Sequence, residues 1–477
     1  MVAFYFPFMN KIESALLAFF NNTNDKAIVV AYSGGVDSQV LLAALSSLKQ
    51  QQQLTNSILV CHVNHGLSAN ANFWQQFATE QCQQFSLPLT IHQLALKKLP
   101  QQSLEAIARD ARYQCLIETS ADSAFIVTGH HLNDQAETFL LALKRGAGLK
   151  GLSSMGQQSS LAQHSLVRPL LAISREDIVA YAQERKLDWI EDESNEDQAF
   201  DRNFIRHTIV PELTHRWPSF NKTLGRSAGH CQDAQLLLNE VAEEDLNKVS
   251  FTDKVLSIPE LLNLSELRFN NVMRFFLAKH DKLMPSSAQL MQIAQQLHAD
   301  SDKNPSVKIA NYCLRRYQQK LYLTDNFMDV SEWSKPIVVT LERKKLELPD
   351  NLGNIQFAVT DGASDIAVTD GASDIVDTDS GVSDSHQDIN IVAPKVGQKV
   401  SIRFSHDNPK CLPHFRDKSR SLKKVLQEAK IPTWQRQRIP FVYYDETLVA
   451  ALGLFVSKNH IPQPEDSKLT LVWLEHK

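Results

Sequence analysis

The stretch from Ala27 to Leu45, AIVVAYSGGVDSQVLLAAL, decides the fold of the part of the chain around it. Its first third, Ala27–Tyr32, is a short apolar run rich in β-branched residues, which is typical of a buried strand in a parallel sheet. Its last third, Gln39–Leu45, lacks Gly and Pro and is rich in strong helix formers. Between them, Ser33–Ser38 takes the chain through two glycines. The stretch therefore predicts a strand, a tight turn and a helix.

The turn has the chemistry of an anion site. The first turn of a helix leaves backbone N–H groups without partners, and the helix dipole adds positive charge there. Glycine lets an anion approach the backbone closely, so we expect a phosphate at this point. Asp37 suits Mg²⁺, and the hydroxyls of Ser33 and Ser38 suit phosphate oxygens. The alternative is an ordinary strand-to-helix turn in which Ser and Asp only cap the helix.

Two known phosphate loops do not match this turn, because it lacks the Lys of a Walker A loop and the third Gly of a dinucleotide fingerprint. The string SGGVDS instead resembles the PP-loop of the ATP pyrophosphatase families. The resemblance implies that a substrate oxygen attacks the α-phosphorus of ATP, which gives an adenylated substrate and pyrophosphate. It implies Mg²⁺ near Asp37. The implied ATP-binding residues are Ser33, Gly34, Gly35, Val36, Asp37 and Ser38.

The segments that follow repeat the alternation of strand and helix. Strands are expected at 58–63, 89–94 and 124–128, and helices at 70–85 and from a cap at Ser103 to about 120. Such alternation predicts an α/β domain with a doubly wound parallel sheet, whose ligands bind at the carboxyl ends of the strands. Four histidines lie at the ends of two of these strands, and they suit either a metal site or hydrogen-bonded scaffold: His62, His65, His130 and His131.

Two further segments resemble the PP-loop enzymes that modify tRNA. GHHLNDQAET at 129–138 is similar to a strand-to-helix loop in which the first His and the Asp lie near the ATP phosphates. LEAIARDARY at 104–113 is similar to a helix with a functional Arg. The resemblance implies catalytic roles for Asp37, Arg112, His130 and Asp134, with Arg112 stabilising charge on the transferred phosphoryl group. Asn133 departs from the Asp of many relatives, so any metal role there passes to Asp134.

Four more motifs follow in one order: RGAGLKGL at 145–152, RPLL at 168–171, DESN at 192–195 and RNFIR at 202–206. Between the RPLL and DESN motifs we expect a helix that begins at Ser174, where Ser174 and Asp177 form a pair like that of a capping box. The acidic motif DESN is alternatively an ordinary solvated loop. The order of motifs resembles the tRNA(Ile)-lysidine synthetase family from Ile28 to about Leu213. The resemblance implies tRNA contacts at Arg145, Lys150, Arg202 and Arg206.

The length of 477 residues predicts several domains. We expect a PP-loop catalytic domain at 1–215, a mostly helical middle domain at 216–330 that contacts tRNA, a linker at 331–390, and an α+β tRNA-binding domain at 391–477. In the middle domain, helices are expected at 220–249 and across 258–299, and short strands across 307–323. Arg315-Arg316-Tyr317 suits either RNA or a solvated edge.

The linker contains a low-complexity stretch. AVTDGASDI occurs in tandem at 358–366 and 367–375, and 359–388 has eight aspartates and no Lys or Arg. Such a segment predicts a disordered, self-repelling linker or loop insertion, and the alternative of a calcium-binding repeat lacks the glycine pattern. The net charge of −5 becomes +3 without these eight charges, so the rest of the chain is mildly basic.

The C-terminal module is basic. Between Lys399 and Arg438, eleven Lys or Arg stand against three Asp or Glu. Strands are expected at 400–404, 439–444, 448–452 and 469–474, with a helix at 421–429. His414, Phe415 and Trp434 lie among these charges, as base stacking and phosphate contacts require, although a basic surface without a partner fits as well. Resemblance to the family's acceptor-stem domain favours tRNA contacts at Arg420, Lys423 and Lys424.

The cysteines and the apolar runs exclude several classes. Six scattered cysteines without a C-x-x-C pair argue against a disulfide framework, a zinc ribbon or an iron–sulfur cluster. No apolar run approaches a membrane span, so we expect a cytoplasmic protein without a membrane partner. The sequence does not set the oligomeric state, and a homodimer is one of the states it allows.

The resemblance implies one reaction with two partners. ATP adenylates the C2 carbonyl oxygen of the wobble cytidine in tRNA(Ile) bearing CAU, and the ε-amine of free L-lysine displaces AMP to give lysidine. The acids that bind lysine stay open among Asp134, Glu137 and Asp192. One alternative is a tRNA 2-thiolation enzyme, which usually needs paired cysteines near the site. Another is an ATP-gated RNA-binding module without transfer chemistry.

Overall fold

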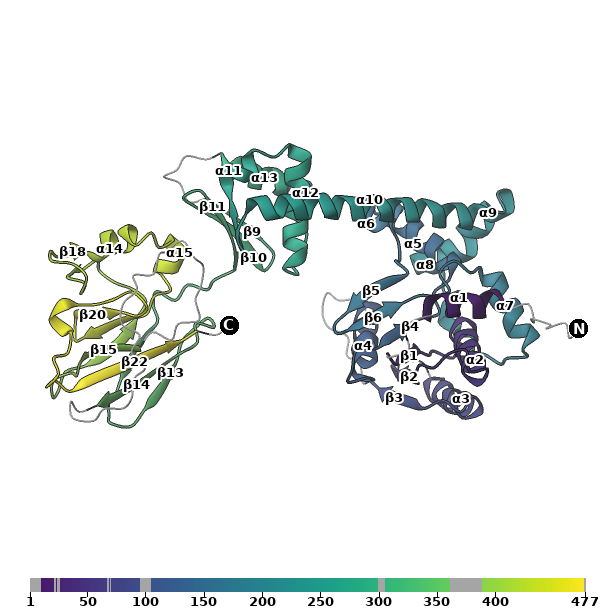
Figure 1. Ribbon diagram of the computed structural model, residues 1–477, viewed down its shortest axis with the longest axis horizontal. Coiled ribbons are helices and arrows are strands. Elements are labelled where there is room, and N and C mark those ends of the chain that lie inside the picture. The colour runs from purple at the N-terminus through teal and green to yellow at the C-terminus, as the bar shows by residue number, and fades with distance from the viewer. Residues whose placement is uncertain are drawn as a thin grey trace, which may run out of the picture. The chain divides into compact units, whose positions relative to one another are not determined.

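The predicted strand, turn and helix lie at the centre of the sheet in the first part of the chain. β1 (Ile28–Ala31) pairs in parallel with β2 (Ile58–Asn64) and β4 (Phe125–Val127). The other strands are β3 (Leu89–Gln93), β6 (His164–Val167) and the antiparallel β5 (Gln158–Leu161). The order β3-β2-β1-β4-β6-β5 moves outward from β1 on both sides, which confirms the doubly wound sheet (Figure 1).

Helices cover both faces of this sheet. One core contains Val30 and the helices α1 (Lys11–Phe20), α2 (Val36–Gln50), α3 (Ala71–Gln84) and α7 (Arg175–Glu184). On the opposite face, Val29 packs against α4 (Leu104–Glu118). Because successive side chains of β1 alternate between two buried faces, its sequence is apolar throughout.

The computed structural model describes residues 10–20, 23, 26–66, 68, 70–94, 104–298, 305–360 and 388–475. They divide into two units, and the first ends at Leu238. The predicted cap at Ser103 lies outside the described residues. The shorter elements of the first unit are α5 (Leu132–Lys144), α6 (Leu149–Leu152), a 3₁₀ turn (Glu193–Glu196), α8 (Asp201–Phe204), a π-helical turn (Ile205–Ile209) and α9 (Val210–Arg216). The predicted helix 220–249 is confirmed as α10 (Phe220–Val249), which continues into the second unit.

The second unit begins with an antiparallel sheet and three helices that share one core. The helices are α11 (Ile258–Leu262), α12 (Glu266–Lys279) and α13 (Ser287–Leu297), as predicted across 258–299. The sheet contains β7 (Ser250–Thr252), β8 (Val255–Ser257), β11 (Lys320–Asp325), β10 (Tyr312–Tyr317) and β9 (Ser306–Ile309), in that order. β7 and β8 were not predicted, since each has only three residues.

Two further sheets share a core near the C-terminus. One contains β12 (Ser334–Ile337), β16 (Val400–Arg403), β19 (Phe441–Tyr444), β20 (Thr447–Ala451) and β21 (Phe455–Val456). The other contains β13 (Lys344–Glu347), β14 (Asn354–Thr360), β22 (Lys468–Leu474) and β15 (Asp388–Val392). The C-terminal region also contains a short strand pair, two helices and a 3₁₀ turn: β17 (Lys410–Cys411) with β18 (Arg420–Ser421), α14 (Leu422–Glu428), α15 (Thr433–Arg436) and Lys458–His460. The predicted strands and helix are thus present.

The prediction of a linker over all of 331–390 is wrong. β12 pairs with β16, and β14 pairs along its whole length with β22, so these strands belong to the C-terminal sheets. The acidic composition of the repeat hid the alternating pattern of β14 beside it. The first three residues of the repeat, 358–360, end β14, and the rest of it lies outside the described residues, before β15; both strands pair with β22. None of the described helices is long and apolar enough to cross a membrane.

Candidate active site

The turn between β1 and α2 closes on the hydroxyl of Ser38. The backbone N–H groups of Ser33 and Gly34 donate to Ser38 Oγ at 3.3 and 3.1 Å, and this hydroxyl donates to Gly35 O at 2.9 Å. Gly34 has a φ of +88°, and a Cβ on it would lie 2.9 Å from Ile190 Cδ1, so only glycine fits without strain. Gly35 precedes α2 without a side-chain cap. The first N–H groups of α2 are therefore suited to an anion.

Asp37, in the first turn of α2, meets residues from later segments. Its two carboxylate oxygens each accept from Arg175 Nη1 at 3.2 Å, and one lies 3.5 Å from His131 Nε2. Gly129 packs on the same turn, since a Cβ on it would lie 2.9 Å from the carbonyl carbon and oxygen of Asp37. The loops after β1 and β4 thus meet, as the sheet order requires. Arg175 was not among the predicted site residues.

Asp134 and Glu137, on one face of α5, pair with two arginines. Arg202 reaches both acids, with Nη2 2.9 Å from Asp134 Oδ1 and Nε 2.8 Å from Glu137 Oε2. Arg206 holds Glu137 through Nε at 2.7 Å and Nη2 at 2.9 Å. Burial opposes ionisation of Asp134, but the neighbouring His131 and Arg202 side chains and the hydrogen bond from the His131 backbone N–H outweigh burial and lower its pKa. The four side chains form a charge-balanced cluster, which we call the acid–arginine cluster.

Arg202 and Arg206 were predicted to contact tRNA, and the structure places them on carboxylates instead of leaving them open to solvent. Their side chains are 34 and 29 % exposed, whereas that of Glu137 is 2 % exposed. The two arginines come one helical turn apart on α8 and the π-helical turn. Their tRNA role stays a prediction, and their contacts in the protein are with α5.

His130 is neutral at pH 7. Burial lowers its pKa to about 4, against the charge of Asp134 and together with nearby guanidinium groups such as Arg168. Thr128 Oγ1 lies 2.7 Å from its Nδ1. Because a bound phosphate would add negative charge here, it would favour the protonated imidazole. The catalytic role of His130 stays a prediction.

Arg112, on α4, is a cation without a carboxylate partner among the described residues. Burial lowers its pKa, and the charges of Arg109 and Arg202 act in the same direction. Its charge in turn lowers the pKa of His65 and His130, so it lies near the carboxyl ends of β2 and β4. A guanidinium held this way is suited to an anionic ligand, which supports the predicted role.

The histidine and asparagine side chains beside these strands mostly support the fold. His62 Nδ1 lies 3.1 Å from Tyr32 O, and burial lowers the pKa of His62. His131 caps α5 and accepts from the N–H of Asn133 at 3.2 Å. Asn133 Oδ1 accepts from Arg175 N at 3.2 Å. The described residues contain no group of three or more His, Cys, Asp or Glu that could hold a metal ion.

Three of the four cysteines in the first unit are poorly suited to sulfur transfer, and the fourth, Cys231, is free and partly exposed. Cys61, Cys82 and Cys115 are buried and free. Burial raises the pKa of Cys61 to about 11 and that of Cys82 to about 12, so both are protonated thiols at neutral pH. Sulfur chemistry needs the thiolate, and these environments disfavour it.

The remaining predicted tRNA contacts are exposed. Arg145 and Lys150 lie on the surface of the first unit, and Arg420, Lys423 and Lys424 lie on that of the second. Each of the five is therefore accessible to a phosphate backbone, and their tRNA contacts stay predictions.

Trp434 does not suit the predicted base stacking. It is 8 % exposed, and its ring lies edge-on to Tyr317 and Tyr322 at centroid distances of 6.1 and 5.3 Å. Phe415 remains exposed beside His414. Of the three ring side chains proposed for RNA, Phe415 and His414 are therefore the accessible ones.

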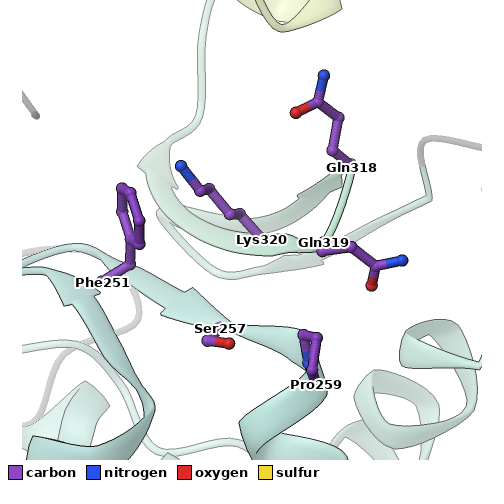
Figure 2. Close-up of a pocket in the computed structure, with 6 residues that line it drawn as sticks. All are labelled: Phe251, Ser257, Pro259, Gln318, Gln319 and Lys320. Atoms are coloured by element: carbon purple, nitrogen blue, oxygen red, sulfur yellow. The ribbon is translucent and has the colours of Figure 1, made fainter. Parts of the chain in front are cut away.

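The surface has two hollows that are separate from the acid–arginine cluster. One of about 320 Å³ borders Gly34 through Ile190, and it is lined by Asn70, Phe73, Trp74, Phe77, Trp189, Ile190 and Glu191. The other, of about 270 Å³, lies in the second unit, where Lys320 Nζ is 3.3 Å from the centre of the Phe251 ring (Figure 2). The described lining of the second hollow has no acid, histidine or cysteine, and its one charged side chain is Lys320.

Three family models match the chain in succession: a PP-loop domain over residues 8–213, the TilS substrate binding domain over 256–322 and the TilS substrate C-terminal domain over 400–473. Among solved structures, a U34-tRNA thiolase NcsA from Methanococcus maripaludis, with its [4Fe-4S] cluster, is 17 % identical. The match covers 46 % of this chain and 77 % of that one, with a TM-score of 0.39.

Curated relatives match nearly the whole chain. A tRNA(Ile)-lysidine synthase from Haemophilus influenzae is 37 % identical, over 90 % of this chain and 95 % of the relative. One from Serratia proteamaculans is 40 % identical, over 90 % and 92 %, and one from Vibrio vulnificus is 38 % identical, over 91 % and 93 %. The PP-loop domain, the two substrate domains and these relatives agree, and the chain belongs to the tRNA(Ile)-lysidine synthase family.

Proposed function

We propose that this protein uses ATP to activate the wobble cytidine of tRNA(Ile) bearing CAU and then joins free lysine to C2 of that base. One observation supports this most strongly. The uncapped start of α2, the carboxylate of Asp37 and the guanidinium of Arg112, which has no carboxylate partner in the described part of the chain, all lie near the carboxyl ends of strands in one sheet. This combination suits a nucleotide whose α-phosphorus is attacked.

Each group has a defined task in this proposal. The N–H groups at the start of α2 hold the pyrophosphate, and Arg112 stabilises charge at the α-phosphate. Asp37 fits Mg²⁺, because that ion takes one or two protein carboxylates together with phosphate oxygens and water. The ion neutralises phosphate charge when bound. His130, neutral in the free protein, donates a hydrogen bond to a phosphate oxygen.

Activation explains why ATP is needed. The C2 oxygen of cytidine is a poor leaving group, and adenylation converts it into AMP, a good one. The ε-amine of lysine then forms the C–N bond as the C–O bond to AMP breaks, and the amine loses a proton. The acid–arginine cluster lies beside Asp37 and offers charges of both signs, which matches the α-ammonium and α-carboxylate of an amino acid.

The substrate RNA would bind through phosphate contacts and an unstacked base. In this proposal, the exposed Arg145 and Lys150 contact phosphates near the site, and the exposed Arg420, Lys423 and Lys424 contact phosphates of another tRNA segment. The wobble base leaves its stack to reach the sheet edge. Such a substrate places the reaction in the cytoplasm.

One assay tests the proposal. The full chain is incubated with ATP, Mg²⁺, labelled lysine and tRNA(Ile) bearing CAU. We expect label on the RNA, with one AMP and one pyrophosphate released for each lysine joined. Sulfur incorporation without lysine would establish 2-thiolation instead. Bound ATP with no tRNA-dependent AMP release would establish a binding module and refute the transfer reaction.

A further inference from the structure

Residues 145–152, which we call the basic loop, have a compact fold and two free cations. Arg145 and Lys150 are exposed and have no ion pair among the described residues. A Cβ on Gly151 would lie 2.6 Å from Ala147 Cβ, so the loop folds tightly on itself. Cations held in one geometry bind a phosphate backbone with less loss of conformational entropy than cations on a loose segment.

The chain just after the basic loop, at Met155, is fixed by a buried glutamine. Gln135 Nε2 donates to Met155 O at 2.8 Å, and Met155 N donates to Gln135 Oε1 at 2.8 Å. The glutamine is 7 % exposed, so both bonds are shielded from water. A two-point contact of this kind fixes orientation as well as distance.

Arg168 holds the chain immediately after this point. Its Nη1 donates to Gly156 O at 2.7 Å and to Ser159 Oγ at 3.4 Å, and its backbone N–H donates to Gln157 O at 2.8 Å. Arg168 is also 7 % exposed. Burying a guanidinium is costly, and its Nε has no hydrogen-bond partner among the described residues. Fold stability alone does not favour this choice of residue over an aliphatic side chain.

Both residues come from elements that also form the candidate active site. Gln135 follows Asp134 in the first turn of α5, where Asp134 joins the acid–arginine cluster. Arg168 follows β6, which pairs with β4, and its charge acts on His130 after β4. The basic loop is therefore tied to the same rigid elements as Asp134 and His130.

We propose that Gln135 and Arg168 are positioning residues for the RNA: they anchor the chain at 155–159, directly after the basic loop, and so hold the loop where phosphates bound to Arg145 and Lys150 direct the target base to the sheet edge. This inference rests on the proposed function, since it takes tRNA as the substrate. It assigns neither residue a contact with ATP or lysine. This anchoring, which we call the clamp, therefore acts on the use of RNA and leaves nucleotide binding unchanged.

The test separates the two substrates kinetically in the full chain. Gln135→Met keeps the side-chain length and removes both hydrogen bonds to Met155. We expect the KM for tRNA to rise about tenfold while the KM for ATP stays within about twofold. The matched control is Gln76→Met, which removes one exposed hydrogen bond to Glu80 on α3, and it should change neither constant.

A second variant guards against misfolding. Arg168→Lys keeps the charge and one donor to Gly156 O, so its KM for tRNA should rise less than that of Arg168→Met. An unchanged KM for tRNA in Gln135→Met, or an equal rise in the KM for ATP, overturns the clamp.

The double variant Arg145→Ala with Lys150→Ala separates this inference from the proposed function. A raised KM for tRNA in it, beside a normal Gln135→Met, refutes the clamp alone. If the double variant also binds tRNA normally, the basic loop is not an RNA contact, and that part of the proposed function fails with the clamp.

Discussion

Replacing Glu137 by Gln should loosen the helix that contains Arg202 and Arg206. Glu137 accepts three charge-assisted hydrogen bonds from these arginines, at 2.7 to 2.9 Å, while its own side chain is 2 % exposed. The substitution keeps the shape and removes the charge. It leaves Asp134 as the single carboxylate facing two guanidinium groups in the acid–arginine cluster.

The magnitude follows from burial. Removing one partner of a buried ion pair costs about 3–5 kcal/mol. The two arginines are about a third exposed, so water compensates part of the loss, and we expect the lower end, about 3 kcal/mol. At about 1.4 kcal/mol per tenfold change, that corresponds to a decrease of roughly a hundredfold in hydrogen-exchange protection.

Hydrogen exchange measured by mass spectrometry on the full chain is the suitable assay, because a chain of two units need not unfold in one step. The peptides of interest cover residues 201–209. Glu118→Gln, which changes an exposed acid on α4, should leave them unchanged. Glu137→Met combined with Arg206→Met should recover much of the protection. A change below about threefold in Glu137→Gln would refute the reasoning, since the pairing would then contribute little.

Asp37→Ala should abolish tRNA-dependent pyrophosphate release, by at least about a hundredfold, with an unchanged circular dichroism spectrum; near-normal turnover would contradict its role. Gly129→Ala should lower stability by about 1–3 kcal/mol in thermal unfolding and weaken ATP binding, because the new methyl meets the Asp37 backbone; unchanged values would show that the loops can separate freely. The His130 ring should titrate near 4 by NMR and shift upward with ATP; His130→Gln identifies the signal, and titration near 6.5 would contradict the described burial. Charge reversal at Lys423 and Lys424 should weaken tRNA binding and flatten its salt dependence, and unchanged affinity would exclude this surface.

The sign of the His130 effect on stability is fixed by its lowered pKa. Above about pH 6.5 the side chain is neutral in both the folded and the unfolded chain. As the pH falls from about 6.5 towards 4, the unfolded chain binds a proton and the folded chain does not, so stability falls. Below about pH 4 both states are protonated and the loss is complete. His130→Gln should remove this part of the pH dependence.

Local sequence patterns predicted the helices and strands well, but they did not predict contacts between residues far apart in the sequence. The apolar run before Ser33 and the helix formers after Ser38 are signals within one segment, and β1 and α2 follow them. The contact between Arg175 and Asp37 joins residues 138 positions apart. No local pattern signals it, since an Arg one residue after a helix cap usually faces water.

The arginines show how burial changes an interpretation. A basic motif such as RNFIR predicts an RNA surface while its neighbours are unknown. Glu137 comes 65 positions before Arg202, and the fold turns these charges inward. The catalytic role was predicted for His130, whereas the neighbouring His131 is the one that lies between Asp37 and Asp134. Only the three-dimensional arrangement distinguishes the two.

The position of the nine-residue repeat has a consequence for how this gene can vary. The strand in which it begins, β14, and the next strand in sequence, β15, both pair with the same strand, β22. Gain or loss of one unit would lengthen or shorten the connection and leave every register in that sheet as it is. The entropy of closing a loop grows only with the logarithm of its length. Copy number at this point should therefore drift among close relatives, while strand lengths on either side stay constant.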